Sequence, residues 1–227
     1  EACRRAGVVF GTAFTVRYAP ETQQARSLAS SGALGPLQAI NATNHGNAYA
    51  AAGTPAWVTD PARSGGGSLA DHTVHCADLI RWFTGAEVAE VYAESGTLFR
   101  PGLLVEDAGL VHLRLTNGII ATIDASWSRL PSFPGWGDLT MHITGQDGSL
   151  FLDFGGDVVR SYGKDPMRRV VSSGPNAYAE MFRDFAAAVR EGREPLATGY
   201  DGIKASEVFL AAYESIRQGR PVSVPLS

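Results

Sequence analysis

The first third of the chain mixes helical and extended patterns of apolar residues. Residues 1–7 have the features of a helix end that stops at a glycine, and residues 8–10 predict a short buried strand. Further elements are predicted over residues 21–31 (helix), 37–45 (strand) and 69–83 (helix). In the last of these, Cys76, Leu79, Ile80 and Phe83 recur at the spacing of a buried helical stripe. Residues 48–67 are rich in Ala, Gly, Pro and Ser and predict a long loop, a feature that is usually functional or disordered.

From residue 88 onward the apolar residues recur at every second position, which is the period of a β-strand. Residues 109–115 and 119–127 alternate in this way around an Asn-Gly dipeptide, which tolerates the positive φ of a tight hairpin turn. A second hairpin is predicted from residues 139–143 and 150–154. Strands are also expected over 88–98, 158–162 and 168–172. The pattern therefore predicts a broad, mainly antiparallel sheet.

The apolar period returns to that of a helix near the end of the chain. Two helices are expected there, and each of them ends at a glycine, Gly192 and Gly219. The first apolar stripe consists of Tyr178, Met181, Phe182, Phe185 and Val189, and the second of Ala205, Val208, Phe209, Ala212, Tyr213 and Ile216. The whole pattern indicates an α+β fold, a large and mainly antiparallel open sheet with helices on one face.

Composition excludes several functional classes. Hydrophobic residues make up 44% of the 227 residues and charged residues 19%, which is typical of a globular protein with a sizeable core. A formal net charge of −4 argues against a nucleic-acid binder, and no apolar run approaches the roughly 20 residues that span a membrane. Cys3 and Cys76 are too few for a disulfide framework, so a cytoplasmic location is expected. Because the chain does not begin with Met, we expect it to be a piece of a longer protein.

The segment from residue 65 to residue 82 is the one that suggests chemistry. It begins with three glycines and places Asp71 and His75 four residues apart in a predicted helix, one turn from each other on one face. A carboxylate beside an imidazole can orient the ring and favour its charged form, which suits proton transfer with a substrate hydroxyl. The same residues are also compatible with a surface pair after an ordinary turn, so this pattern alone leaves the function open.

The order of residues in this segment resembles the C-terminal domain of the Gfo/Idh/MocA family, the relatives of glucose–fructose oxidoreductase and inositol dehydrogenase. The shared string is Gly-Gly-Gly-x-Leu-x-Asp-x-x-x-His-x-x-Asp-x-x-x-Trp, from Gly65 to Trp82. Flanking motifs agree in order and spacing: Arg17-Tyr18-x-Pro20, Ser31-Gly32-x-Leu34-Gly35, Trp57, Gly145-x-x-Gly148-Ser149-Leu150 and Gly199-x-Asp201-Gly202-x-Lys204-Ala205. The resemblance therefore covers essentially the whole chain.

This resemblance implies a parent protein of two domains. Residues 1–18 would be the last helix–strand of a dinucleotide-binding Rossmann domain, and residues 19–227 a substrate-binding and oligomerisation domain. The implied activity is hydride transfer between the nicotinamide of NAD or NADP and a carbon of a sugar or polyol. The cofactor would be bound mainly by the N-terminal domain, and the open sheet face would join subunits into a homo-oligomer.

The resemblance also implies roles for individual residues. His75 would be the acid/base, alone or with a lysine of a Glu-Lys-Pro motif, and Asp71 would hydrogen-bond a substrate hydroxyl or orient His75. Four further substrate-binding positions are implied: Arg17 where the two domains meet, His72 and Thr73 on an exposed start of the same helix, and Trp57 ahead of the glycines.

Two parts of that family's equipment are missing from this chain. No Gly-x-Gly-x-x-Gly follows a strand, and no Glu-Lys-Pro is present. Lys164 and Lys204 are the only lysines, and neither has that context. The chain alone is therefore expected neither to bind NAD tightly nor to catalyse, and roughly 100–150 residues, an ordinary domain, are expected upstream.

Other interpretations stay open. Asp71 and His75 could hold a metal ion together with His45 or His142, although the usual spacing of further ligands is lacking. The chain could instead be a non-catalytic domain that binds sugar or dimerises, or belong to relatives that use NAD for glycoside hydrolysis. An aromatic loop at residues 127–136 suits either a sugar ring or a subunit contact.

Overall fold

The structure is a computed structural model, and the description covers residues 1–47, 55–130, 132–133, 135–154, 156, 158–162, 168–171 and 176–226. Part of the loop expected at residues 48–67, the expected strand end at Ser172 and the residue Lys164 lie outside these described residues. The described part of that loop is not irregular throughout, because it contains a 3-10 turn (Ala56–Thr59) and a short helix α3 (Pro61–Ser64).

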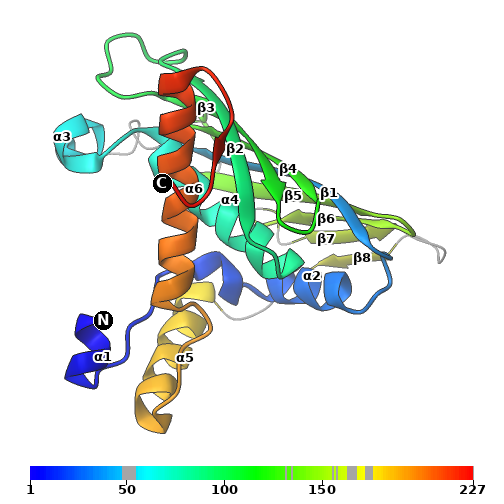
Figure 1. Ribbon diagram of the computed structural model, residues 1–227. Helices are drawn as coiled ribbons and strands as arrows, with labels where there is room; N and C mark the ends of the chain where they lie inside the picture. The colour runs from blue at the N-terminus through cyan, green and yellow to red at the C-terminus, as the bar shows by residue number, and fades with distance from the viewer. Residues whose placement is uncertain are drawn as a thin grey trace.

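One open sheet forms the centre of the molecule (Figure 1). Its nine strands lie in the order β8-β7-β6-β5-β1-β4-β3-β2-β9. The strands are β1 (Leu37–Gly46), β2 (Val88–Gly96), β3 (Ala108–Leu115), β4 (Ile120–Ser126), β5 (Gly137–Gly145), β6 (Ser149–Asp153), β7 (Val158–Tyr162), β8 (Arg168–Val171) and β9 (Val222–Ser223). All neighbouring strands pair antiparallel except β1 and β4, which are parallel. The prediction of a mainly antiparallel sheet is confirmed, and only the short strand β9 was missed.

Helices pack on one face of this sheet, as the apolar pattern predicted (Figure 1). The helices that contact the sheet are α2 (Pro20–Ser30), α4 (Ser68–Thr84) and α6 (Gly199–Gln218). Helix α5 (Ala177–Glu191) packs against a 3-10 turn at Thr15–Tyr18, and α1 (Ala2–Ala6) precedes that turn. Helix α4 lies over β1, β3 and β4 in the middle of the sheet, and α6 packs against both α4 and β2. Helix α4 is therefore enclosed between the sheet and a second helix.

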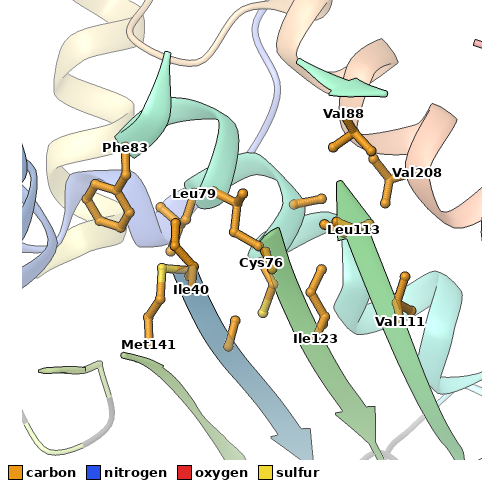
Figure 2. Packing of buried hydrophobic residues seen from close by; sticks show 14 of the residues in the cluster. Ile40, Cys76, Leu79, Phe83, Val88, Val111, Leu113, Ile123, Met141 and Val208 are labelled. Atoms are coloured by element: carbon orange, nitrogen blue, oxygen red, sulfur yellow. The ribbon is translucent and has the colours of Figure 1, made fainter. Parts of the chain in front are cut away.

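The core lies between α4 and the sheet (Figure 2). Cys76 and Leu79 of α4 point toward Ile40 of β1 and Ile123 of β4, and all four side chains are buried. The stripe predicted on α4 is thus the face that holds the helix on the sheet. This packing fixes where the first turns of α4, which carry Asp71 and His75, stand relative to the strand ends.

Two apolar segments remain uncovered, contrary to what their sequence suggested. Residues 8–10 do not form the predicted buried strand: Val8 and Phe10 are 57% and 58% exposed, and in the described chain only an isolated bridge between Gly11 and Thr198 follows them. On α5, the predicted apolar stripe forms, but Phe182 is 66% exposed and its neighbours Tyr178 and Val189 are exposed as well. Phe10 lies against Gly199 at the start of α6, and α5 contacts the 3-10 turn at Thr15–Tyr18, but the outer apolar side chains of both segments stay exposed.

Candidate active site

Glycines at the start of α4 are required because a side chain and a backbone carbonyl approach the chain closely there. A Cβ on Gly66 would lie 1.8 Å from the hydroxyl oxygen of Tyr213, and a Cβ on Gly67 would lie 1.9 Å from the carbonyl oxygen of Glu106. The carboxylate of Glu106 accepts hydrogen bonds from the backbone N–H groups of Gly67 (2.9 Å) and Leu69 (3.0 Å) and from the Tyr213 hydroxyl (2.8 Å). Since helix N-termini attract negative charge, Glu106 caps and orients α4.

Three of the residues predicted for the site line one pocket of about 350 Å³ at this end of α4. Asp71 and His75 project from successive turns of the helix, and Trp57 comes from the 3-10 turn that precedes α3. Trp127, at the end of β4, also lines the pocket. The pocket therefore combines a carboxylate, an imidazole and two indole rings, the mix of apolar walls and few polar groups that is typical of small-molecule sites.

The carboxylate of Asp71 is held by neighbours other than His75. Its Oδ2 accepts a hydrogen bond from the indole N–H of Trp127 at 2.8 Å and lies 3.6 Å from Nε2 of His72. Within the described part of the chain, no hydrogen bond or ion pair joins Asp71 to His75. The side chain of Asp71 is 37% exposed, so the carboxylate is both oriented by Trp127 and open to the pocket.

His75 is enclosed and lacks a partner for one ring nitrogen. Burial lowers its pKa below the usual 6.5, although the nearby carboxylate of Asp71 acts in the opposite direction, so the ring is neutral at pH 7. Its Nδ1 is buried and has no hydrogen-bond partner among the described residues. Besides the pocket with Asp71, His75 lines a second cavity of about 140 Å³ with Asn44 and Trp136. A neutral imidazole between two cavities is equipped to accept a proton.

The expectation that His72 and Thr73 lie on an exposed helix start is wrong. Both residues are fully buried, because the first turns of α4 are covered by the sheet on one side and by the loop before β5 on another. The ring of Trp136 lies 5.4 Å from that of His72, and Nδ1 of His72 is 2.8 Å from Oδ1 of Asn44 on β1. Neither His72 nor Thr73 lines the pocket that contains Asp71.

Arg17 is placed in a buried ion pair and not at the pocket. Its guanidinium donates two hydrogen bonds, of 2.7 and 2.6 Å, to the carboxylate of Asp78 on α4, and it lies 3.1 Å from a carboxylate oxygen of Asp201 on α6. Arg17 is only 3% exposed. Burial raises the pKa of Asp78 to about 6, although the Arg17 guanidinium acts in the opposite direction. In this chain, Arg17 joins three elements of the fold.

Sequence reasoning missed Glu106, Tyr213 and Asn44, which support the site from a distance. All three lie far from α4 in sequence. Tyr213 was predicted only as part of an apolar helix stripe, and nothing in the local pattern marks Glu106 or Asn44. Trp127 was noted only as part of an aromatic loop. A large buried aromatic residue directly after a strand, with an N–H that needs an acceptor, was the available signal.

The described residues form no metal cluster, and the longest helices have no free N-terminus for a cofactor phosphate. In the described ranges, no group of three His, Cys, Asp or Glu side chains is placed to hold a metal ion. The three longest helices have N-termini already occupied: α4 by Glu106, α5 by Asn176, and α6 by the reciprocal cap of Thr198 and Asp201. A dinucleotide pyrophosphate needs a free helix N-terminus or a glycine-rich cradle, so these helix starts do not fit NAD or NADP.

Among the described helices, none combines the length and the apolar character that a membrane span requires.

The structure is an α+β domain with a pocket at the start of its central helix, lined by a carboxylate and an imidazole. The family model of the GFO/IDH/MocA C-terminal domain matches residues 22–151, more than half of the chain. The chain belongs to this family, as the motif order from Gly65 to Trp82 predicted.

Relatives of known name agree with this assignment. The chain is 27% identical to the uncharacterized oxidoreductase YrbE of Bacillus subtilis over 98% of its own length and 65% of that protein. It is 24% identical to myo-inositol 2-dehydrogenase of Thermotoga maritima, covering 99% of this chain and 67% of that one. Among solved structures it is similar to GenD2 from gentamicin A biosynthesis in complex with NAD, with a TM-score of 0.82 and 28% identity over 99% of this chain and 66% of that one. The chain thus spans about 65% of the length of such relatives.

Proposed function

We propose that this chain is the substrate-side domain of an NAD(P)-dependent oxidoreductase that moves hydride between the nicotinamide and a hydroxyl-bearing carbon of a sugar or polyol. The pocket that brings Asp71, His75 and Trp57 together carries the proposal. Its support from relatives is that one similar protein is a myo-inositol 2-dehydrogenase and that another was solved with NAD.

His75 is the proposed acid/base. Because burial keeps the imidazole neutral at pH 7, a ring nitrogen can accept the proton of a substrate hydroxyl as that carbon is oxidised. The reverse transfer accompanies reduction. A hydroxyl in the pocket would meet His75 without competition from Asp71, since Asp71 is bonded to Trp127.

Asp71 and Trp57 are proposed to orient the substrate. The half-exposed carboxylate of Asp71 can accept a hydrogen bond from a second hydroxyl, and a carboxylate acceptor makes that bond about twice as strong as a neutral one. The indole of Trp57 is 45% exposed and offers a flat apolar wall to the C–H face of a ring. Together the two groups distinguish a polyhydroxylated ring from a simple alcohol.

The nicotinamide cofactor is proposed to be held outside the residues described above. When bound, the nicotinamide supplies the hydride acceptor or donor. In the same proposal, residues 1–18 close a dinucleotide-binding domain and residues 19–227 form the substrate domain. The exposed apolar side chains of Val8, Phe10 and Phe182 support this division, because exposed apolar patches usually mark a contact surface.

The lysine of this reaction is also proposed to come from outside the described residues. Nζ of Lys204 lies 2.9 Å from a carboxylate oxygen of Glu207 and 5.6 Å from the ring of Tyr200, both on α6. Lys204 therefore belongs to the surface of α6 and not to the pocket of Asp71.

The open face of the sheet is proposed to join copies of the chain. Leu110 of β3 and Ile120 of β4 are 52% and 59% exposed on this face, beside polar side chains such as His112 and Arg114. An exposed sheet face with isolated large apolar residues suits a symmetric contact. Sedimentation of the purified protein tests this, and Ile120→Lys should shift a homo-oligomer toward monomer.

A cytoplasmic location is part of the same proposal. Cys3 and Cys76 are both free, and a reducing compartment keeps thiols in that state. Fractionation of cells that produce the parent protein tests this location.

The experiment that tests the function uses the full parent protein. Purified protein is assayed with a panel of sugars and polyols, myo-inositol among them, with NAD⁺ and with NADP⁺, and the absorbance of reduced nicotinamide is followed. Reduction with at least one polyol supports the proposal, and the 227-residue chain alone serves as the inactive control. Binding of a sugar without any turnover, or release of sugar from a glycoside, would replace it by the non-catalytic or the hydrolytic alternative.

A further inference from the structure

His72 stands directly behind the candidate site in a position that it cannot leave. His72 is fully buried. A Cβ on Gly46 would lie 2.7 Å from Nε2 of His72, so only glycine fits at the end of β1. The ring of Trp136 lies 5.4 Å away on the same side of the molecule. These contacts restrict the imidazole to one orientation.

The hydrogen bonds of Asn44 determine which nitrogen of His72 carries the hydrogen. The Asn44 amide nitrogen donates to the backbone oxygen of Asp138 at 2.9 Å, so the amide oxygen is the atom that lies 2.8 Å from Nδ1 of His72. An amide oxygen only accepts, and therefore Nδ1 is the donor. In the neutral ring, Nε2 then has a lone pair and no hydrogen.

The nitrogen that carries this lone pair lies close to Asp71. Nε2 of His72 is buried, has no hydrogen-bond partner among the described residues, and lies 3.6 Å from Oδ2 of Asp71. A buried acceptor without a donor is costly unless a donor arrives during function. In the described part of the chain, the carboxyl of Asp71 is a group at this distance that becomes a donor when it takes up a proton.

The surroundings of His72 keep its ring neutral until then. Burial lowers the pKa of His72 to about 4, and the charges of His75 on α4 and His45 on β1 act in the same direction. The carboxylates of Asp71 on α4 and Asp138 on β5 act in the opposite direction. Since burial outweighs them, Nε2 is available as an acceptor at pH 7.

We propose that His72 is a positioning residue for Asp71, and that its Nε2 accepts a hydrogen bond from the carboxyl group of Asp71 whenever that group is protonated. Asp71 would receive the proton that His75 has taken from a substrate hydroxyl, so that the N–H bond on His75 breaks and an O–H bond forms on Oδ2 of Asp71. His72 then fixes the protonated carboxyl in one orientation, while Trp127 fixes the ionised form. This rests on the proposed function only for the step that involves substrate.

The first test needs neither substrate nor cofactor. The 227-residue chain is labelled with ¹⁵N-histidine, and two-bond ¹H–¹⁵N spectra are recorded between about pH 2.5 and pH 8 for the wild type and for Asp71→Asn, with His72→Gln to assign the signal. The wild type should show the Nδ1–H tautomer of His72. Asp71→Asn should move its titration to lower pH by roughly one unit, as expected when an opposite charge is removed. An Nε2–H tautomer, or an unchanged titration in Asp71→Asn, would overturn the proposal.

The second test uses the parent enzyme with its best substrate. His72→Phe keeps an aromatic ring of similar size and removes both nitrogens; kcat should fall roughly tenfold to a hundredfold, less than for loss of an acid/base group, with a displaced pH–rate profile. Cys76→Ala, at another fully buried position of α4, is the matched control and should keep the wild-type profile. A wild-type kcat and profile in His72→Phe would contradict the role. If no substrate turns over but the spectra show the coupling, the proposed function fails while the pairing of His72 with Asp71 stands.

Discussion

Helix α4 carries titratable side chains in two regions. The regions differ in whether these side chains have hydrogen-bond or ion-pair partners. In the middle of the helix, Asp78 accepts two hydrogen bonds from Arg17, and Arg81 donates two of 2.7 Å to Glu87. At the start of the helix, His75 and His72 each have a buried nitrogen without a partner in the described chain. Charges that satisfy each other hold elements together, whereas buried polar atoms left unpaired beside a pocket await a ligand or a proton.

The largest effect on turnover is expected from a substitution in the first turns of α4. In the parent enzyme, His75→Gln should lower kcat by roughly 10²–10⁴, because the acid/base is removed while a polar side chain of similar length remains. Stability should change little, since the Nδ1 atom of His75 makes no hydrogen bond to lose. Steady-state kinetics and urea unfolding measure the two effects. Unchanged turnover would remove His75 from the mechanism.

A substitution in the middle region of α4 should instead lower stability more than turnover. Arg17→Met leaves the buried carboxylate of Asp78 unpaired, and loss of one partner from a buried pair costs about 3–5 kcal/mol of unfolding free energy. The matched control is Arg217→Met, whose pair with Glu214 is 71% exposed on the arginine side, so its loss should change the free energy of unfolding little. Urea unfolding followed by tryptophan fluorescence compares them.

The same pair of variants decides the role that the family resemblance implies for Arg17. A raised KM in folded Arg17→Met, with stability close to that of Arg217→Met, would return Arg17 to the substrate site. Loss of stability with an unchanged KM would identify it as a structural residue.

These regions also show what the sequence could predict. The buried stripe of α4 and the alternation of β3 and β4 follow from local periodicity, and both are confirmed. The placement of Asp71 and His75 on successive turns follows from helix geometry alone. The covering of His72 by Trp136 and Gly46 does not, because those residues approach from elements that are distant in sequence.

The contacts of Arg17 are a second feature that the sequence could not predict. Its motif position suggested a substrate contact, but its side chain turns to Asp78 and Asp201 once α4 and α6 are packed together. Local sequence carries no information about which of several acidic residues a long arginine will reach. The exposed stripe of α5 is a third case, since periodicity predicts an apolar face but not what covers it.

Acid should weaken the start of α4, while protonation of Asp78 in the middle of the helix acts in the opposite direction. His72 has a pKa of about 4 in the folded chain and 6.5 when unfolded, so the unfolded chain alone binds this proton between those values. Its stability contribution is complete above pH 6.5 and is lost as pH falls to 4, by roughly 3 kcal/mol. Asp78, with its pKa raised from 3.8 to about 6, acts oppositely and loses its contribution as pH rises over that interval. Urea midpoints against pH should therefore fall less steeply on the acid side in His72→Phe than in the wild type; equal slopes would contradict this assignment.

The smallest effect is expected at the edge of the pocket. Trp57→Ala removes a half-exposed ring that no described ion pair depends on, so only binding of substrate should suffer. A ring contact is worth about 0.5–1.5 kcal/mol, which corresponds to a rise in KM of up to roughly tenfold with kcat unchanged. Trp57→Phe keeps a flat apolar wall and should recover most of the loss. A fall in kcat with unchanged KM would instead place Trp57 among the groups that act on the reacting atoms, and the division between a binding wall and the acid–base pair on α4 would have to be redrawn.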